Sequence, residues 1–476
     1  MRVEKKALAR AIRVLKTVVM PRPFKPVLGS VLFTGGYAYG TDLEHTIKVA
    51  VAPGAQSEPP FLIPWSAFKS LKGDTEIAPV LTDPEKPKVK IGGATLESFK
   101  IEDFPALPEA IPSRLQTVNM EHLLLHLRRC DVVRATGETA RALLTGIGVC
   151  EDGAIIATDG FAVYWSDPEP CYEGRALASA AGGQGVLPGV TCAILSAFGW
   201  DHASAGAETK TMEQDSYAGG KRTTIKTNQT RWYFGSDGEA AWLRGLEGRY
   251  FAVRDLVPKE FPHTATFDRL ELLQAVEEAA KVAREAPHPV ILQIGAGGVR
   301  VYARQEGNEF DGDLRPVAAA GGPLTAGFNT QLLMAALGRI AEGMDEVTLE
   351  MSGATTLARV KVDEGTYCIM PLQMPGEVPE RAVPDGVSVA VEAPAPPAPA
   401  ESEKGPDPER QADPIPAEGP VQPAEPEAEG APEPVTAVTE DPAEVTSDDD
   451  LAALINRAQE AVARATDLLA RLLASA

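Results

Sequence analysis

The feature that most constrains this chain is a pattern of apolar and polar residues that repeats along it. In each of three segments, an extended stretch runs into a helix whose apolar residues are spaced three and four positions apart. A second helix pattern, with a short apolar lead and a break before the helix, falls between those segments. The first pattern covers residues 2–18, 117–133 and 266–283, and the second covers residues 61–71, 186–198 and 328–340.

Strand-like runs with turn signals fill the intervals, for example at 290–304 and 346–370. A supersecondary unit that recurs in this way predicts an internally repeated fold. We therefore expect an α+β protein of three tandem domains, each made of two helix-plus-antiparallel-sheet halves. The expected domain bounds are 1–114, 115–260 and 261–378.

The pattern ends near residue 378, and the rest of the 476-residue chain has a different composition. Fourteen prolines and no aromatic residue fall between Pro394 and Pro442, so residues 379–447 are predicted to be a disordered linker that cannot bury enough apolar surface to fold. Residues 448–476 open with three aspartates and continue with apolar residues at alternating steps of four and three, which predicts an amphipathic helix. That helix either docks on the rest of the chain or binds a partner or a second copy, and the pattern favours neither.

The cysteines and the N-terminus indicate a cytoplasmic protein. The five cysteines are widely spaced without a CxxC pair, which argues against a disulfide framework. The N-terminal stretch is basic and amphipathic rather than a short apolar run with a small-residue cleavage site, so we expect no secretory signal. No run of about 18 apolar residues occurs, and we expect no membrane partner.

The net charge of −22 is unevenly distributed. Residues 386–476 carry 19 acidic and 5 basic residues, which leaves 48 acidic and 40 basic residues for the rest of the chain. Residues 1–40 hold eight Lys and Arg but a single acid, Glu4. Net acidity alone argues against nucleic acid as a partner, but a basic face within an acidic protein is compatible with it.

Basic side chains alternate with the apolar positions of the first helix and recur at the matching place of the second segment. The candidates are Lys6, Arg10, Arg13 and Arg22, followed by Arg128, Arg129 and Arg134. Few aromatic residues accompany them, so the pattern indicates sequence-independent contacts to phosphates rather than base stacking. A solvated charged face with no nucleic-acid role is the alternative.

No catalytic motif is evident. The chain has no Walker loop, GxGxxG, HExxH, GxSxG or EF-hand pattern, and we expect neither an enzyme, nor a cofactor, nor a metal. His122, His126 and Cys130 share one helix face, but a metal site needs further ligands, and packing or surface roles are favoured. Asp42 and Asp159 both follow a threonine and are interpreted as equivalent turn residues rather than as a two-carboxylate metal site.

Residues 141–167 read as two apolar strands joined by Asp-Gly turns. The turn Ala157-Thr158-Asp159-Gly160 offers no nucleophile–base pair and no metal ligand set. The stretch is therefore typical of a scaffold that grips another protein.

Eight short motifs follow one another in order along the chain. They are Arg22-Pro23 with Pro26-Val27-Leu28-Gly29, Thr41-Asp42-Leu43-Glu44, Glu102-Asp103-Phe104-Pro105, Leu144-Thr145-Gly146, Ala157-Thr158-Asp159-Gly160, Gly248-Arg249-Tyr250, Phe328-Asn329, and Tyr367-Cys368-Ile369-Met370-Pro371-Leu372. Each motif is weak by itself, but together they make residues 1–375 resemble the bacterial DNA polymerase III beta sliding clamp family. Residues 200–245 look longer and more irregular than in that family, and the stretch after residue 378 lies outside its pattern.

The resemblance implies a head-to-tail homodimeric ring with helices around a central hole and sheets on the outer rim. Double-stranded DNA would pass through the hole, and contacts to its phosphates that ignore sequence would allow sliding. Members of the family do no chemistry. They confer processivity by tethering the DNA polymerase, and clamp-loader subunits open the ring. The resemblance thus also implies a cytoplasmic, nucleoid-associated protein.

The resemblance further implies a pocket between the second and third domains that takes apolar anchors of partner peptides. Its positions map onto Leu144, Thr158, Gly160, Phe161, Ala162, Val163, Phe251, Leu256, Cys368, Met370, Pro371 and Leu372. Phe161-Ala162 replaces the usual His-Arg, Phe251 stands where proline is usual, and Gln373 replaces a common arginine, so we expect an altered peptide preference. The alternative is that these residues are core positions at strand ends.

The leading hypothesis is a DNA sliding clamp that serves as a processivity factor. The alternative is a clamp-derived interaction scaffold that does not encircle DNA and recruits partners through its C-terminal helix.

Overall fold

The computed structural model describes residues 2–372, apart from 54–58, 81–85, 109, 138, 168–171, 219–220, 284–288 and 296–297. The described part belongs to one compact unit, residues 1–395. The predicted linker over 379–447 and the predicted helix over 448–476 lie outside the described residues, as does Gln373.

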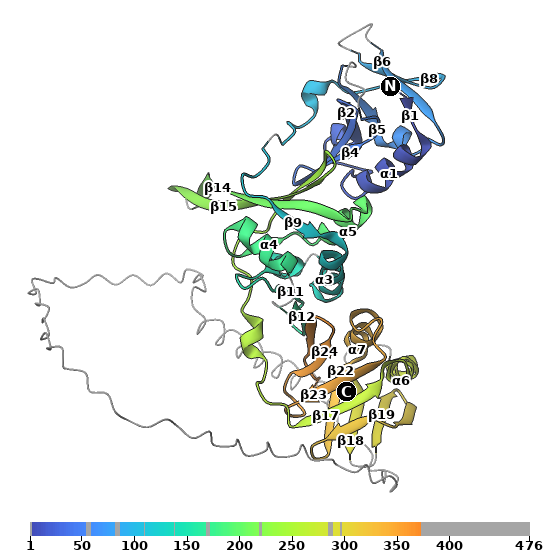
Figure 1. Ribbon diagram of the computed structural model, residues 1–476, viewed down its shortest axis with the longest axis vertical. Coiled ribbons are helices and arrows are strands. Elements are labelled where there is room, and N and C mark those ends of the chain that lie inside the picture. Colours follow the sequence, from blue (N-terminus) through green and yellow to red (C-terminus); the bar gives the residue numbers. More distant parts are fainter. Residues whose placement is uncertain are drawn as a thin grey trace, which may run out of the picture. The chain divides into compact units, whose positions relative to one another are not determined.

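Four antiparallel sheets make up the described part of the chain (Figure 1). The first has the order β1 (Arg2–Val3), β6 (Thr75–Val80), β7 (Lys88–Ile91) and β8 (Ala94–Glu97). The second has the order β5 (Phe61–Pro64), β2 (Ser30–Thr34), β3 (Tyr37–Thr41), β4 (His45–Ala50), β16 (Glu239–Arg244), β15 (Lys221–Ser236), β14 (His202–Ala218) and β9 (Gln116–Asn119). The third has the order β13 (Gly185–Leu187), β10 (Ile147–Val149), β11 (Ile155–Thr158), β12 (Ala162–Ser166), β25 (Gly365–Ile369), β24 (Ala358–Val362), β23 (Glu346–Met351), β17 (His263–Asp268) and β21 (Ala318–Ala320). The fourth has the order β20 (Asn308–Leu314), β19 (Gly298–Gln305), β18 (Pro289–Gly295) and β22 (Leu324–Asn329).

The helices follow the two sequence patterns. They are α1 (Lys5–Leu15), α2 (Trp65–Phe68), α3 (Met120–Val133), α4 (Tyr172–Ala181), α5 (Thr191–Phe198), α6 (Arg269–Val282) and α7 (Thr330–Ala335), with short turns η1 (Pro26–Gly29), η2 (Ile101–Asp103), η3 (Ala142–Thr145), η4 (Val253–Leu256) and η5 (Ala336–Ile340). Three helices begin at side chains that accept from free backbone N–H groups, namely Asn119, Asp268 and Asn329. Helix α4 lies outside both sequence patterns and was not predicted.

One topological rule repeats six times. Each half of the body contains a run of three consecutive hairpin strands, and a fourth strand pairs with the first strand of the run. The fourth strand follows the run in three halves (β5, β13 and β22) and precedes it in the other three (β1, β9 and β17). The α+β prediction of repeated helix-plus-antiparallel-sheet halves is therefore confirmed.

Two of the sheets cross the expected domain boundaries. The last strand of one run joins the last strand of another, so that β4 pairs with β16 and β12 pairs with β25. Each joint combines a half whose fourth strand follows its run with a half whose fourth strand precedes it. We call the two joints the first seam (β4–β16) and the second seam (β12–β25).

The two Thr-Asp turns are equivalent, as the sequence predicts. The Asp42 carboxylate accepts from the backbone N–H groups of Glu44 and His45, at 2.9 and 2.6 Å. The Asp159 carboxylate accepts from those of Phe161 and Ala162, both at 2.7 Å. In both aspartates a carboxylate oxygen closes the turn by accepting two backbone hydrogen bonds. Turn formation rather than metal binding therefore explains these two residues.

The stretch that looked irregular in sequence is a long hairpin. Strands β14 and β15 pair continuously from Ser204–Gly235 to Ala218–Lys221. Only the residues at the base of the hairpin pair with other strands of the second sheet: β9 pairs with residues 202–205, and β16 pairs with residues 231–236. The expectation of irregular structure over 200–245 is wrong in this respect: the extra residues extend two paired strands.

Candidate partner-binding and DNA-binding surfaces

The turn between β11 and β12 is the first component of the candidate peptide site. Thr158 is buried, and its hydroxyl donates to the Ala162 carbonyl at 2.6 Å and accepts from Gly160 N–H at 3.0 Å. Gly160 has a φ of 94°, which glycine adopts at low cost. The turn holds Phe161 at its tip, where that side chain is 63% exposed.

The second component is the last described segment of the chain. Val163 pairs with Cys368 in the second seam, and Met370 N–H donates to the Phe161 carbonyl at 2.8 Å. Pro371 is buried, and Leu372 N–H donates to the Gly327 carbonyl at 2.8 Å. The structure therefore brings the predicted residues of 158–163 and 368–372 side by side.

The third component is the segment that precedes β17. The buried Tyr250 hydroxyl accepts from Thr158 N–H at 3.0 Å, and burial raises the pKa of this phenol above its usual value. Tyr250 belongs to an apolar cluster with Ile156, Val163, Val186 and Cys368, which we call the junction cluster. All three components thus meet at the second seam.

The predicted pocket residues divide by their contact with the junction cluster. Val163 and Cys368 belong to it, whereas Leu143, Val253 and Val257 pack against it in place of the predicted neighbours Leu144 and Leu256. Leu144 and Phe251 are half-buried and Leu256 is 54% exposed. Tyr250, which the pocket prediction missed, was present in the Gly248-Arg249-Tyr250 motif. An aromatic residue with a hydroxyl in that motif was the available signal.

The junction offers contact surface rather than a reacting group. Burial raises the pKa of the Cys368 thiol to about 12, so the sulfur stays protonated and is a poor nucleophile. Phe161 and Leu256 are large apolar side chains left in solvent beside this buried cluster. Exposed apolar groups at a well-ordered turn suit the binding of an apolar peptide side chain.

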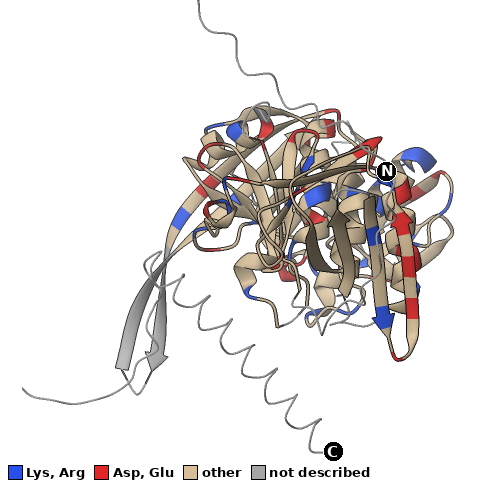
Figure 2. Cartoon of the chain, turned by 90° about the horizontal axis from the view of Figure 1, so that it is seen from below, with Lys and Arg blue, Asp and Glu red and all other residues tan. Residues whose placement is uncertain are grey.

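Four of the predicted DNA-binding residues are exposed. They are Lys6 and Arg13 on α1, Arg22 after it, and Arg128 on α3. Arg13 Nε also donates to the Ala197 carbonyl at the end of α5, at 3.0 Å. Figure 2 shows basic and acidic residues interspersed over the described part of the chain, including close to the N-terminus.

The other three predicted DNA-binding residues are held by the protein. Arg129 is 5% exposed and donates to the Asp363 carbonyl at 2.5 Å. Arg10 donates to both carboxylate oxygens of the buried Glu239, and Arg134 pairs with Asp131 at 2.7 Å. Periodicity placed these arginines on a helix face, but it could not show that the face meets acceptors from distant strands. Arg129 in particular is buried and bonded within the protein, which disfavours a contact of this side chain with phosphate.

Comparisons with known proteins agree with the motifs. Residues 254–373 match the family model described as the C-terminal domain of the DNA polymerase III beta subunit. The beta sliding clamp of Streptomyces coelicolor is 24% identical over 398 residues, which cover 79% of this chain and 99% of that protein. The beta sliding clamp of Synechocystis is 23% identical over 396 residues, which cover 77% of this chain and 97% of that protein.

The chain is thus similar to beta sliding clamps over most of its length, and its residues 254–373 match the C-terminal domain of that family. Solved clamps share its fold. The DNA polymerase III subunit beta of Pseudomonas aeruginosa matches with a TM-score of 0.64 and 20% identity, over 79% of this chain and 100% of that one. The DNA polymerase sliding clamp of Bacillus subtilis matches with a TM-score of 0.63 and 17% identity, over 78% of this chain and 98% of that one. Within the described residues, no helix is both long and apolar enough to cross a membrane.

Proposed function

We propose that this beta sliding clamp homologue encircles duplex DNA as a head-to-tail homodimer and tethers the replicative polymerase to it. Its role is mechanical rather than enzymatic. Polymerase and clamp-loader subunits would dock through short peptides at the junction cluster, and the protein would work in the cytoplasm on nucleoid DNA. The observation that carries the proposal is that β8 and β20, two strands at sheet edges, could each pair with a strand of a second subunit.

Strands β8 and β20 end the two smaller sheets without a partner strand in the described part of the chain. Each is the third strand of its hairpin run, and third strands are the ones that join at both seams. The run that ends in β20 has its fourth strand after it, and the run that ends in β8 has its fourth strand before it. By the rule of the seams, β20 of one subunit is therefore matched to β8 of another.

Head-to-tail pairing of this kind satisfies both edges of both subunits when two copies close a ring. The backbone groups that would face the partner follow from the ladder. Ser98 N–H donates to the Pro87 carbonyl at 2.9 Å, and alternation along the antiparallel pair then directs the N–H groups of Thr95 and Glu97 outward. An unsatisfied row of this kind is a template for another strand.

The contacts to DNA would come from exposed basic residues of the helices. Lys6, Arg13, Arg22 and Arg128 are exposed, and contacts of such side chains to phosphates carry no sequence information. Binding should therefore weaken steeply as salt is added and should not depend on the DNA sequence.

The test is retention on circular and linear DNA. Clamp loaded on a nicked plasmid should stay bound through gel filtration and should be lost after the plasmid is linearised, because a ring slides off an end. Equal loss from both forms would reject encirclement and would favour the scaffold alternative. Equal retention on both forms would indicate direct binding rather than a topological link, and would likewise reject it.

A substitution in β8 tests the ring itself. Thr95→Pro removes an outward N–H from an exposed edge position while leaving the bonds to β7 in place. Thr95→Val keeps the N–H and is the matched control. Sedimentation should give a dimer for the wild type and for the valine variant, and a monomer for the proline variant at the same concentration. A dimer in all three would place the subunit contact elsewhere.

A further inference from the structure

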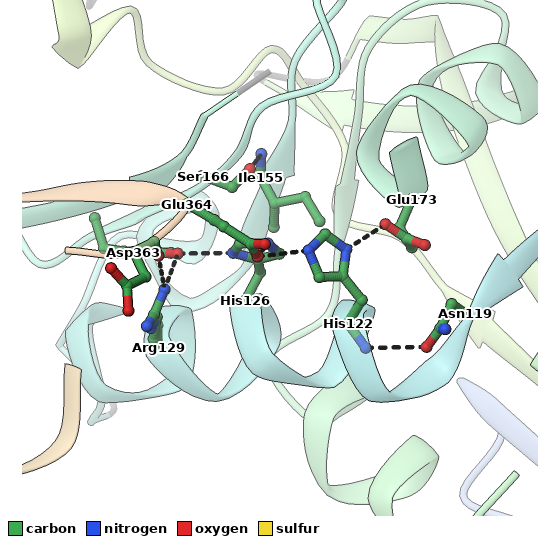
Figure 3. A network of polar contacts seen from close by, with 10 residues as sticks. Asn119, His122, His126, Arg129, Ile155, Ser166, Glu173, Asp363 and Glu364 are labelled. Carbon is green, nitrogen blue, oxygen red and sulfur yellow. Dashed lines mark hydrogen bonds and ion pairs between the residues drawn. The ribbon is translucent and has the colours of Figure 1, made fainter. Parts of the chain in front are cut away.

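Helix α3 and the β24–β25 hairpin meet at a cluster of polar side chains (Figure 3). His122 and His126 lie one turn apart on α3, and Glu364 lies in the hairpin turn between β24 and β25. His122 Nε2 is 2.6 Å from Glu364 Oε2, and His126 Nε2 is 3.8 Å from the same oxygen. One possible ligand atom from each of the three residues lies within 4.8 Å of the other two.

Each histidine has a second polar group that fixes which nitrogen faces Glu364. His122 Nδ1 contacts Glu173 Oε2 from helix α4 at 2.5 Å, so this carboxylate holds the proton on Nδ1. His126 Nδ1 contacts the Tyr164 hydroxyl of β12 at 2.7 Å. Each Nδ1 thus has its own polar partner and both Nε2 atoms lie on the Glu364 side, where each could bind a metal ion once its proton is displaced.

His126 is the observation that needs an explanation. Its side chain is fully buried, and its Nε2 atom has no hydrogen-bond partner. A fully buried ring nitrogen without a partner thus faces a carboxylate oxygen 3.8 Å away, and a cation between the two atoms would satisfy both.

We propose that His122, His126 and Glu364 bind one zinc ion. Two imidazole nitrogens and one carboxylate form a donor set that zinc uses in proteins, with water as the fourth ligand. Side-chain exposures of 24% for His122 and 36% for Glu364 leave room for that water. Bonds of about 2.0–2.1 Å imply ligand atoms roughly 3.3 Å apart in a tetrahedron, and the separations of 2.6 and 3.8 Å lie on either side of that value.

The electrostatic surroundings suit a divalent cation. Glu173 and Glu364 each bring a negative charge, and Arg129 is the basic side chain beside them. Arg129 is committed to the Asp363 carbonyl at 2.5 Å and lies over the Tyr164 ring at 5.8 Å. Glu173 would act on the metal through His122, as a carboxylate that orients the ligand and raises its basicity.

The site would join two domains. Helix α3 belongs to the second expected domain and the β24–β25 hairpin to the third, next to the second seam. The two histidines share a helix face with Cys130 in the sequence, but Cys130 lies in the main apolar core. The third ligand is instead 238 positions beyond His126 in the sequence, and the expectation of no metal gives way to this proposal. The site does not depend on the clamp function.

The test uses the full-length chain without an affinity tag, stripped with chelator and titrated with Zn²⁺ by calorimetry. We expect one ion per chain and a rise in melting temperature on binding. Glu364→Gln and His126→Gln should each weaken the site at least 100-fold, and Glu173→Gln should weaken it roughly 10- to 100-fold. His202→Gln, at an exposed histidine outside the cluster, is the matched control and should bind as the wild type does.

Cobalt substitution gives a second readout, because the intensity of the visible Co²⁺ bands reports a four-coordinate site that Glu364→Gln should abolish. Glu364 lies in a hairpin turn, so this variant tests the site even if the buried His126→Gln variant fails to fold. Absence of stoichiometric binding in the wild type would overturn the proposal. Equal binding by the Glu364→Gln and His202→Gln variants would also overturn it, because the ion would then lie elsewhere, for example on cysteines.

Discussion

Replacing Arg10 should destabilise the protein, although its position on a basic helix suggests a DNA contact. Its guanidinium donates to both oxygens of Glu239, with Nη2 to Oε2 at 2.7 Å, and to the Phe198 carbonyl at 3.0 Å. Glu239 is 4% exposed and also accepts from Ala50 N–H at 3.0 Å and Trp200 Nε1–H at 2.9 Å. These contacts link α1, the end of β4, the start of β16, the last residue of α5 and Trp200 at the first seam.

The size of the effect follows from what each variant leaves behind. Arg10→Met leaves a buried carboxylate with only two donors, and breaking a buried ion pair in this way costs about 3–5 kcal/mol. Glu239→Gln added to it replaces the charge by an amide that still accepts a hydrogen bond, so the double variant should recover about 1–2 kcal/mol of that loss. Lys6→Met, at an exposed position of the same helix, should change stability by less than about 0.5 kcal/mol.

Urea unfolding, followed by circular dichroism, measures these differences in the free energy of unfolding when all variants have the same dependence on urea concentration. Retention on nicked circular DNA, measured for the same variants, separates stability from DNA contact. Arg10→Met should lower the urea midpoint, whereas Lys6→Met should lower the salt at which the clamp leaves DNA. If Arg10→Met is as stable as Lys6→Met, the ion pair contributes nothing and Arg10 returns to the DNA-binding candidates.

Three further predictions concern the junction. Phe161→Ser should weaken binding of a labelled partner peptide about tenfold at unchanged stability, measured by fluorescence anisotropy, because an exposed aromatic contact surface is lost; equal affinity would exclude Phe161 from the site. Cys368 should resist Ellman's reagent until the protein is unfolded, since burial raises its pKa to about 12, and peptide mapping of native protein labelled there would contradict this. Burial alone raises the pKa of Asp152, but hydrogen bonds from Arg254 and a backbone amide outweigh it and lower that pKa. The stabilisation of the folded protein by the Asp152–Arg254 pair is thus complete above the pKa of Asp152 in the unfolded chain, about 3.9. It is lost as the pH falls through the lower pKa of Asp152 in the folded protein. Arg254→Met should therefore reduce the acid dependence of unfolding, and identical pH profiles would count against the pair.

Local sequence signals predicted the repeated architecture because each repeat carries its own helix start, apolar spacing and turn. The Thr-Asp turns at 41–45 and 158–162 are closed by hydrogen bonds within five consecutive residues, so the local sequence alone determines them. The same holds for helices α3 and α6, whose first turns are capped by Asn119 and Asp268.

Contacts between distant segments were out of reach of that reasoning. The role of Arg129 depends on the Asp363 carbonyl, and the environment of His126 depends on Glu364, each more than 200 positions away. Helical periodicity indicates which residues share a face, but it gives no information on what covers that face. The internal bonds of Arg129 and the proximity of Glu364 to His126 were therefore missed for the same physical reason.

The open edges have a consequence for the subunit before it assembles. A free strand edge can recruit the wrong partner, including the same edge of another copy, and so start aggregation. On β20, Glu309, Asp311 and Asp313 alternate with Phe310 and Leu314, which pack against the core, so the acidic side chains share the opposite face. Asp311 is paired with Arg300, but two β20 strands brought together would still set Glu309 and Asp313 against like charges, whereas β8 carries a single acid, Glu97. Charge on one edge thus discourages like-with-like pairing during synthesis and leaves the productive match open.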